Sequence, residues 1–84
     1  MPEELVGEVT HFYAGPMLAT VFVLTGAIQV GDRLHFAGRS TNFHTLVESL
    51  QENQLPLHVA GPGQSIGVQV PQRAQVGDRV FRVT

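Results

Sequence analysis

The sequence predicts an all-β domain, and three observations lead to that fold class. Short apolar stretches recur along the chain, separated by turn signals that contain Gly, Pro or Asp. The motif Val-Gly-Asp-Arg occurs twice, at residues 30–33 and 76–79, each time just before an apolar alternation. At most one segment has the periodicity of a helix. We therefore expect six or seven short strands arranged as a barrel or a sandwich.

The first two strands are expected at residues 5–13 and 17–24. The first is rich in β-branched and aromatic residues and ends at the Ala-Gly-Pro turn of residues 14–16, so the two strands are predicted to form a hairpin. Because a small domain has only one interior, the second strand has a surplus apolar face, expected under a loop or at an interface. Its two faces are Ala19, Val21 and Val23, and Leu18, Phe22 and Leu24.

Phe22 and Leu24 are the apolar residues that this surplus singles out. They are candidates for a docking surface that meets another protein or a second copy of the chain. The alternative is burial beneath the loop of residues 37–43, since single apolar side chains are also common on protein surfaces.

The two Gly-Asp pairs are expected to be turns that lead into strands at residues 33–37 and 79–83. Gly permits the positive φ that such a turn often needs, and an Asp side chain accepts hydrogen bonds from nearby backbone amides. Asp32 and Asp78 are therefore interpreted as turn-capping residues, since no base or nucleophile motif accompanies them. The two turns are predicted to mark equivalent corners of one domain.

The segment of residues 43–54 supports two interpretations. Its apolar residues recur at i, i+3, i+4 and i+7, with N-cap candidates before them and Pro56 beyond, which is typical of an amphipathic helix. The alternative is a strand with a bulge between Val47 and Leu50. Periodicity alone favours the helix.

The C-terminal part of the chain again reads as short strands. Residues 57–60 are apolar, and residues 61–63 form a Gly-Pro-Gly loop. Residues 65–70 alternate apolar and other residues and end at Pro71, as expected for a half-buried strand. No linker or repeat divides the sequence, so residues 1–84 are predicted to be a single domain.

Composition and charge exclude several classes of function. The 84 residues contain no Cys, which excludes disulfides, thiol nucleophiles and cysteine-ligated metal. The formal net charge is −2 and the five basic residues, all Arg, are scattered, so we expect no DNA partner and no polybasic binding of RNA. No apolar run is long enough to cross a bilayer, and the N-terminal residues lack the pattern of a signal peptide. We therefore expect a cytoplasmic protein without a membrane partner.

No motif in the sequence predicts catalysis or a metal. Four His residues occur, at positions 11, 35, 44 and 58, but no two have a helical i, i+4 spacing, so they are interpreted as half-exposed strand residues and no metal site is predicted. Ser65 stands in the sequence Gly63-Gln-Ser-Ile-Gly67, which matches a Gly-x-Ser-x-Gly pattern, but this segment is expected to be a loop that leads into a strand and not the strand–turn–helix that a nucleophile elbow needs. The sequence therefore predicts a protein that is not an enzyme and has no cofactor.

Four sequence blocks together carry a resemblance to a known domain. They are Gly26-x-Ile-x-Val-Gly-Asp32, Val47-Glu-Ser-Leu-Gln51, residues 60–68 (Ala-Gly-Pro-Gly-Gln-Ser-Ile-Gly-Val) and Val76-Gly-Asp78. In order and spacing they resemble the second domain of translational GTPases such as elongation factor Tu. The chain looks closer still to small stand-alone elongation-factor-like proteins and to the C-terminal barrel of some collagenase-like peptidases. In those proteins a Thr-x-Phe loop, here Thr41-Asn-Phe43, precedes the Val-Glu-Ser-Leu-Gln block.

The resemblance implies a small closed antiparallel β-barrel of six to seven strands, in which residues 47–51 form a strand rather than a helix. It also implies partner-binding positions. Those matching the residues with which elongation factor Tu holds aminoacyl-tRNA are Gln51, Gln54 and Ser65, which keep polarity but lack charge. Gly63 and the loop residue Arg39 complete the predicted binding face.

The expected function is that of a non-catalytic binding module for a protein or RNA partner of the translation apparatus. The chain contains no Gly-x-x-x-x-Gly-Lys-Ser/Thr loop, so it is not expected to bind a nucleotide as a GTPase does. Two alternatives remain: a homo-oligomeric scaffold in which Phe22 and Leu24 meet a twin surface, and an accessory barrel of a peptidase complex.

Overall fold

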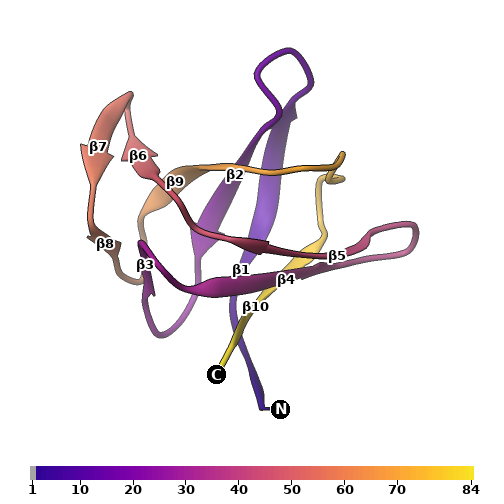
Figure 1. Ribbon diagram of the computed structural model, residues 1–84, viewed down its shortest axis with the longest axis horizontal. Coiled ribbons are helices and arrows are strands. Elements are labelled where there is room, and N and C mark those ends of the chain that lie inside the picture. Colours follow the sequence, from indigo (N-terminus) through magenta and orange to yellow (C-terminus); the bar gives the residue numbers. More distant parts are fainter. Residues whose placement is uncertain (1) are drawn as a thin grey trace.

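The computed structural model describes residues 2–84, which form ten strands and no helix (Figure 1). No helix that could cross a membrane is therefore present in this part of the chain. The strands are β1 (Glu3–Tyr13), β2 (Leu18–Val23), β3 (Ile28–Gln29), β4 (Arg33–Ala37), β5 (Asn42–Leu46), β6 (Leu50–Glu52), β7 (Leu55–Leu57), β8 (Val59–Ala60), β9 (Ser65–Gln69) and β10 (Arg79–Val83). The predicted all-β class is confirmed.

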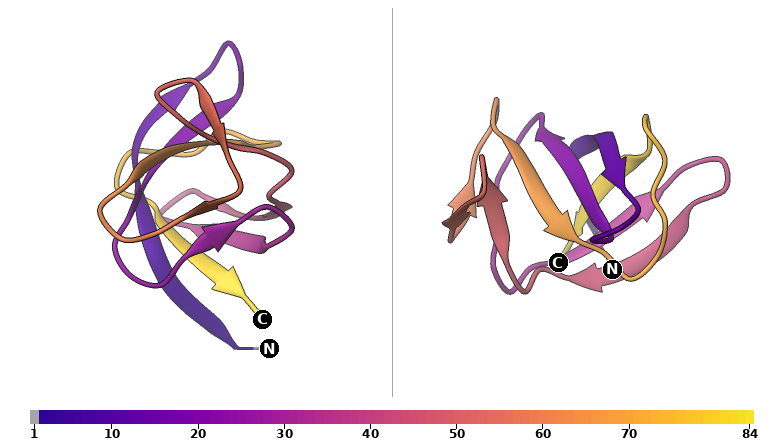
Figure 2. Two further views of the ribbon diagram at one scale, coloured as in Figure 1. Left: turned by 90° about the vertical axis from the view of Figure 1, so that its left-hand side faces the viewer. Right: turned by 90° about the horizontal axis from the view of Figure 1, so that it is seen from above.

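Eight strands form one antiparallel sheet, in the order β5-β4-β10-β1-β2-β9-β6-β7, and β3 pairs with β8 in a separate two-stranded sheet. The predicted β1–β2 hairpin is confirmed. The large sheet curls around the core, as the two views in Figure 2 show. It is nevertheless open, because β5 and β7 are its edges and are not paired with each other. The prediction of a closed barrel with six to seven strands is therefore corrected to ten strands in one large open sheet and one small one.

The extra strands have a simple physical reason. The predicted strands that have a clear counterpart, β1, β2, β4, β9 and β10, are each at least five residues long. The strands missed as separate elements, such as β3 and β8, have only two residues each, which is too short for an alternation of apolar and polar residues to be visible.

Residues 43–54 contain no helix, so the preference for strands is confirmed. The block of residues 47–51 is not one strand, however, because β5 ends at Leu46 and β6 begins at Leu50. Val47 and Leu50 are 1% and 2% exposed, so both enter the core from either side of this corner. Their helix-like spacing therefore comes from a corner between two strands.

The two Gly-Asp turns have the same geometry. Gly31 and Gly77 have φ values of 100° and 94°, which only Gly adopts readily. The N–H of Asp32 donates to the Gln29 carbonyl, and Oδ2 of Asp32 accepts from the Gln29 N–H at 2.9 Å. The second turn repeats both bonds between Asp78 and Gln75, the side-chain bond at 2.8 Å. The interpretation of both Asp residues as caps is confirmed.

Each turn also holds one buried Val through two backbone hydrogen bonds. Gly31 donates to the Val47 carbonyl and Val47 donates to Asp32, both at 2.8 Å. Gly77 and Asp78 make the same pair of bonds with Val9, also at 2.8 Å. The two turns are therefore equivalent corners, as predicted.

The core is built from the inward faces of the strands. Of the two apolar faces of β2, the one that carries Ala19, Val21 and Val23 is fully buried. Phe36 of β4 and Phe43 of β5 stack inside the sheet with ring centroids 4.9 Å apart. The outward faces of the same strands are therefore left to form the functional surfaces.

Candidate functional site

A groove of about 550 Å³ crosses the outer side of β2 and β9, between the β1–β2 turn and the β6–β7 turn. In Figure 1 these two turns are the upper loop and the upper left corner of the molecule. The residues that line the groove are Tyr13, Pro16, Leu18, Thr20, Gln51, Asn53, Gln54, Ser65, Ile66 and Gly67. Three of the predicted binding residues, Gln51, Gln54 and Ser65, are thus brought together.

Gln51 is placed in the groove by its pairing with a glycine. Leu50 points into the core, so the next residue of β6, Gln51, points outward and lies opposite Gly67 of β9. A Cβ atom on Gly67 would lie only 3.1 Å from Cγ of Gln51 and 3.2 Å from Cδ2 of Leu18. Glycine therefore gives the Gln51 side chain room to lie across the sheet at the floor of the groove.

Both turns beside the groove contain residues with a left-handed backbone. Among residues 2–84, the non-glycine residues with positive φ are Met17 at 54°, Asn53 at 51° and Gln54 at 68°. Asn tolerates this conformation, whereas Met and Gln adopt it at a cost. Residues with a strained backbone conformation often cluster at binding sites, where the identity of the side chain matters more than the conformational energy of the backbone.

The groove is uncharged. The residues that line it include no Asp, Glu, Lys or Arg and instead offer amides from Gln and Asn, and hydroxyls from Ser, Thr and Tyr. An amide side chain both donates and accepts hydrogen bonds, so it can pair with the N–H and C=O groups of a peptide backbone. This arrangement fits a neutral polar ligand better than a phosphate-bearing one.

The other predicted binding residues lie outside the groove. Gly63 has a φ of 89° in the turn before β9, and its N–H donates to the Val23 carbonyl at 2.8 Å. Arg39 lines a second hollow of about 360 Å³ with Ser40 and the Gly77-Asp78 turn. The predicted binding face is therefore divided among three places: the groove, the turn that contains Gly63, and the hollow beside Arg39.

Phe22 and Leu24 differ in exposure. Leu24 is 45% exposed, so the predicted burial is wrong for this residue. Phe22 is half-buried and pairs with Glu8 of β1 and Ser65 of β9 on the side of the sheet away from the core. The docking surface remains a prediction.

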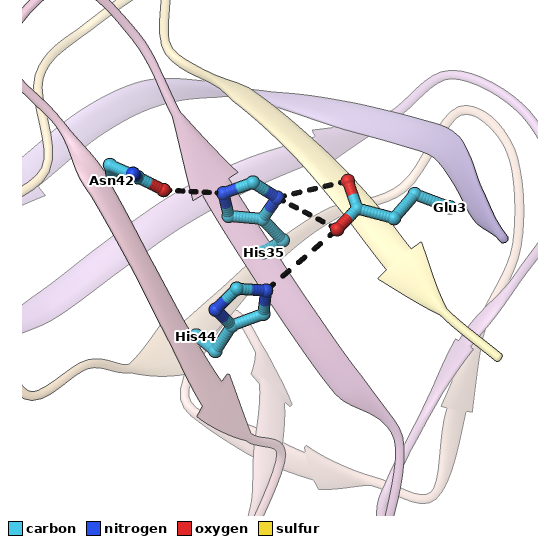
Figure 3. A network of polar contacts seen from close by, with 4 residues as sticks. All are labelled: Glu3, His35, Asn42 and His44. Carbon is cyan, nitrogen blue, oxygen red and sulfur yellow. Dashed lines mark hydrogen bonds and ion pairs between the residues drawn. The ribbon is translucent and has the colours of Figure 1, made fainter. Parts of the chain in front are cut away.

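A second cluster lies on the outer face of β1, β4 and β5, and Figure 3 shows its four residues. Nδ1 of His35 is 2.9 Å and 3.0 Å from the two carboxylate oxygens of Glu3. Nε2 of His44 is 3.7 Å from Oε2 of Glu3, and the two imidazole rings stack with centroids 4.3 Å apart. Nε2 of His35 lies 2.6 Å from Oδ1 of Asn42. One carboxylate and two imidazoles thus converge.

These contacts shift the ionisation of two groups. The hydrogen bond with Glu3, followed by the one with Asn42, raises the pKa of His35 above its ordinary value. The hydrogen bond with His35 lowers the pKa of the Glu3 carboxyl in turn. Both shifts favour the charged forms, so the two groups stabilise each other as an imidazolium–carboxylate ion pair.

Sequence reasoning missed this cluster because its members are far apart along the chain. His35 and His44 are cross-strand partners in the β4–β5 hairpin, and Glu3 reaches them across β10. The Gly-Arg-Ser-Thr loop after residue 37 was a usable signal, since a hairpin around it pairs His35 with His44. The position of Glu3 depends on the pairing of β1 with β10, which no local pattern predicts.

Comparison with known proteins places the fold. No protein-family model matches the chain. It is 29% identical over 77 residues to an uncharacterized protease of Methanocaldococcus jannaschii, a match that covers 90% of this chain and 19% of that protein. The chain therefore spans about a fifth of the length of the curated relative it matches.

Two crystal structures of the C-terminal domain of a U32 peptidase from Geobacillus thermoleovorans resemble the chain. One, with 22% identity, has a TM-score of 0.86 and covers 92% of this chain and 96% of that domain. The other, with 21% identity, has a TM-score of 0.89 and covers 96% and 93%. These matches fit the predicted resemblance to the C-terminal domain of collagenase-like peptidases and give no support to the one to elongation factor Tu. The chain is thus similar in fold to the C-terminal domain of a U32 peptidase.

Proposed function

We propose that this domain is a non-catalytic polypeptide-binding module that serves a peptidase of the U32 type. In this proposal the groove between the β1–β2 and β6–β7 turns holds an extended, uncharged stretch of polypeptide. The observation that carries the proposal is the lining of the groove, which combines amide and hydroxyl groups with no charged side chain. The domain binds the chain, and a separate part of the peptidase cleaves it.

A polypeptide suits the groove better than RNA does. Binding of nucleic acid draws most of its affinity from Lys and Arg near phosphates, and none of these residues lines the groove. A peptide backbone instead presents donors and acceptors in alternation, which Gln51, Asn53 and Gln54 can match. Each neutral hydrogen bond contributes about 0.5–1.5 kcal/mol, so several are needed for measurable affinity.

The named relatives favour a peptidase-associated role over a translation-associated one. The curated relative is described as a protease, and the two solved structures are of a peptidase's C-terminal domain. The match covers only 19% of the length of the protease, which suits a domain that accompanies other parts of an enzyme. This supports the accessory-domain alternative that the sequence analysis left open.

Titration followed by amide resonances tests the proposal. Isotope-labelled protein is mixed with a pool of short capped peptides of Gly, Ala, Ser, Thr, Asn and Gln, or with an oligouridine of similar length. We expect the peptides to shift resonances at Gln51, Gln54 and Ser65, and the oligouridine to leave them in place. Gly67→Val should weaken the affinity for the peptides about tenfold, equivalent to about 1.4 kcal/mol, since the Val side chain displaces Gln51.

Arg39→Ala serves as the control, because Arg39 lines the other hollow and should not affect peptide binding. Peptide shifts confined to other parts of the chain, or tighter binding of the oligouridine than of the peptides, would contradict the proposal.

A further inference from the structure

The donor atoms of Glu3, His35 and His44 have the spacing of a metal site. One ligand atom from each residue lies within 4.8 Å of the others. Two ligands of a tetrahedral zinc ion, each about 2.0–2.2 Å from the metal, are about 3.3–3.6 Å apart. The observed distances from the Glu3 carboxylate to His35 and His44, 2.9 Å and 3.7 Å, lie on either side of that range. We propose that these three residues bind a divalent transition-metal ion, with zinc as the best-suited metal.

Asn42 orients His35 for this role. Its Oδ1 accepts a hydrogen bond and lies 2.6 Å from Nε2 of His35, so Nε2 is the nitrogen that carries a hydrogen. The ionised carboxylate of Glu3 only accepts, so its contact with Nδ1 of His35 holds a cation: a proton on Nδ1, which then donates to Glu3, or a metal ion that takes the place of that proton. Metal-bound His residues usually have their other ring nitrogen held by such a partner.

The cluster combines a fixed part with an adjustable one. The His35 side chain is 18% exposed and held on both sides, whereas the Glu3 and His44 side chains are 33% and 49% exposed. The two rings lie within 15° of parallel, so His44 must turn for its nitrogen to point at the same ion as Nδ1 of His35. Its exposure leaves room for this rotation.

The chemistry of the ligands selects the metal and limits its affinity. Imidazole and carboxylate ligands together suit zinc, and three protein ligands leave a position for water or for a group from a partner. The charges nearby are mixed: Arg33 lines a small hollow with His44, and the carboxylate of Glu4 is already paired with Arg82 at 3.2 Å. With one free carboxylate and a neighbouring Arg, we expect micromolar rather than nanomolar affinity.

A bound ion would connect strands that are not neighbours in the sheet. Glu3 is on β1, and β10 separates this strand from β4 and β5, which carry the two His residues. The metal would therefore fix one end of β1 across four strands. This consequence predicts a rise in thermal stability when zinc is added, since the folded state alone has the assembled site.

Calorimetric titration of the untagged, metal-free chain with zinc chloride tests the proposal, and cobalt(II) absorption reports the coordination. We expect one zinc ion per chain and a higher melting temperature with excess zinc. Glu3→Gln, His35→Gln and His44→Gln should each weaken binding about tenfold or more, because each removes a ligand. Asn42→Ala should weaken it about tenfold although all three ligands remain, because His35 loses its orienting partner.

His58→Gln provides the matched control, since His58 is exposed and lies outside the cluster. It should bind zinc as the unmodified chain does, and circular dichroism without metal shows whether each variant is folded. Absence of one-to-one binding, or equal affinity in the three ligand variants and the unmodified chain, would overturn the proposal. The cluster would then be an ion pair held together by a proton.

Discussion

The two Gly-Asp turns have the same sequence and the same hydrogen bonds, but they differ in what covers them. The first turn is more open, because Asp32 is only half-buried. The second turn is covered: Asp78 is only 5% exposed, and its carboxylate lies against Gly38 of the β4–β5 loop. One local motif thus occurs in two environments within the same molecule.

The comparison separates local turn energy from tertiary packing. Effects that depend on backbone conformation should be equal at the two turns, because φ and the capping bonds are nearly the same. Effects that depend on the cover should appear only at the second turn. The stability predictions below are measured as the free energy of unfolding in urea.

The largest effect is expected for Gly38→Ala. The new Cβ would overlap Oδ1 of Asp78 and lie 2.6 Å from its Cγ, so the loop or the buried carboxylate must move. Overpacking of this kind costs about 1–3 kcal/mol, and we expect the upper end of that range because the capping bond to Gln75 is disturbed as well.

Gly61→Ala is the control for this substitution, because a Cβ there meets nothing within 4 Å and the backbone is not left-handed. It should change stability by less than about 0.5 kcal/mol. Equal stability of the two variants would show that Gly38 does not pack on Asp78.

The second prediction is that the loss of the Asp78 cap destabilises the fold more than the loss of the Asp32 cap. Asp78→Ala removes from the Gln75 N–H an acceptor that is itself only 5% exposed, which we expect to cost about 2–3 kcal/mol. Asp32→Ala exposes the Gln29 N–H to solvent, so its cost should be about 1 kcal/mol.

Asp78→Asn tests the cause, since its amide oxygen can still accept from Gln75. It should therefore recover part of the stability lost in Asp78→Ala. Equal losses in the two Asp→Ala variants would mean that burial of the second turn contributes nothing.

The third prediction is that the same substitution costs the same stability at both turns. Gly31→Ala and Gly77→Ala each force a residue with a Cβ into the left-handed region, at φ values of 100° and 94°, with no steric overlap at either site. The left-handed conformation costs about 1–2 kcal/mol. We expect both variants to lose the same amount, and a clearly larger loss at Gly77 would show that the cover also constrains the backbone.

The turns also show how far sequence reasoning reaches. Gly, Asp and the alternation after them predict a capped turn, a strand and its buried face, and all three are local properties. The cover on Asp78 comes from a loop 40 positions away (78 − 38), and nothing around either turn encodes it. The prediction of a closed barrel was wrong for a similar reason, because the edges at β5 and β7 follow from the pairing order of the strands, which no local pattern encodes.

The same distinction applies to the two candidate sites. Gln51, Gln54 and Ser65 are predicted from the resemblance to elongation factor Tu, and they line one groove because the β6–β7 turn and the alternation along β6 and β9 place them there. Glu3, His35 and His44 meet only through the pairing order β5-β4-β10-β1, which requires contacts across most of the chain. A site formed by long-range pairing of strands therefore cannot be predicted from local sequence patterns.

The smallest effect is expected at a turn without the Gly-Asp motif. In the β6–β7 turn, Asn53 and Gln54 both have positive φ, the backbone of a type I′ turn, in which the second position favours Gly. Gln54→Gly should therefore stabilise the fold by about 0.5–1 kcal/mol, opposite in sign to the losses at Gly31 and Gly77. Asn53→Gly should change little, because Asn already tolerates this conformation.

Peptide titration of Gln54→Gly and Asn53→Gly shows whether the left-handed Gln54 contributes to peptide binding in the groove. If the Gln54 side chain binds the ligand, the more stable Gln54→Gly variant should bind the peptide pool more weakly, and Asn53→Gly shows how much of any loss comes from a neighbouring amide. A variant that is both more stable and equally able to bind would mean that the left-handed Gln is strain without a role in binding. Weaker binding together with greater stability would instead identify the turn as a place where stability is sacrificed for recognition.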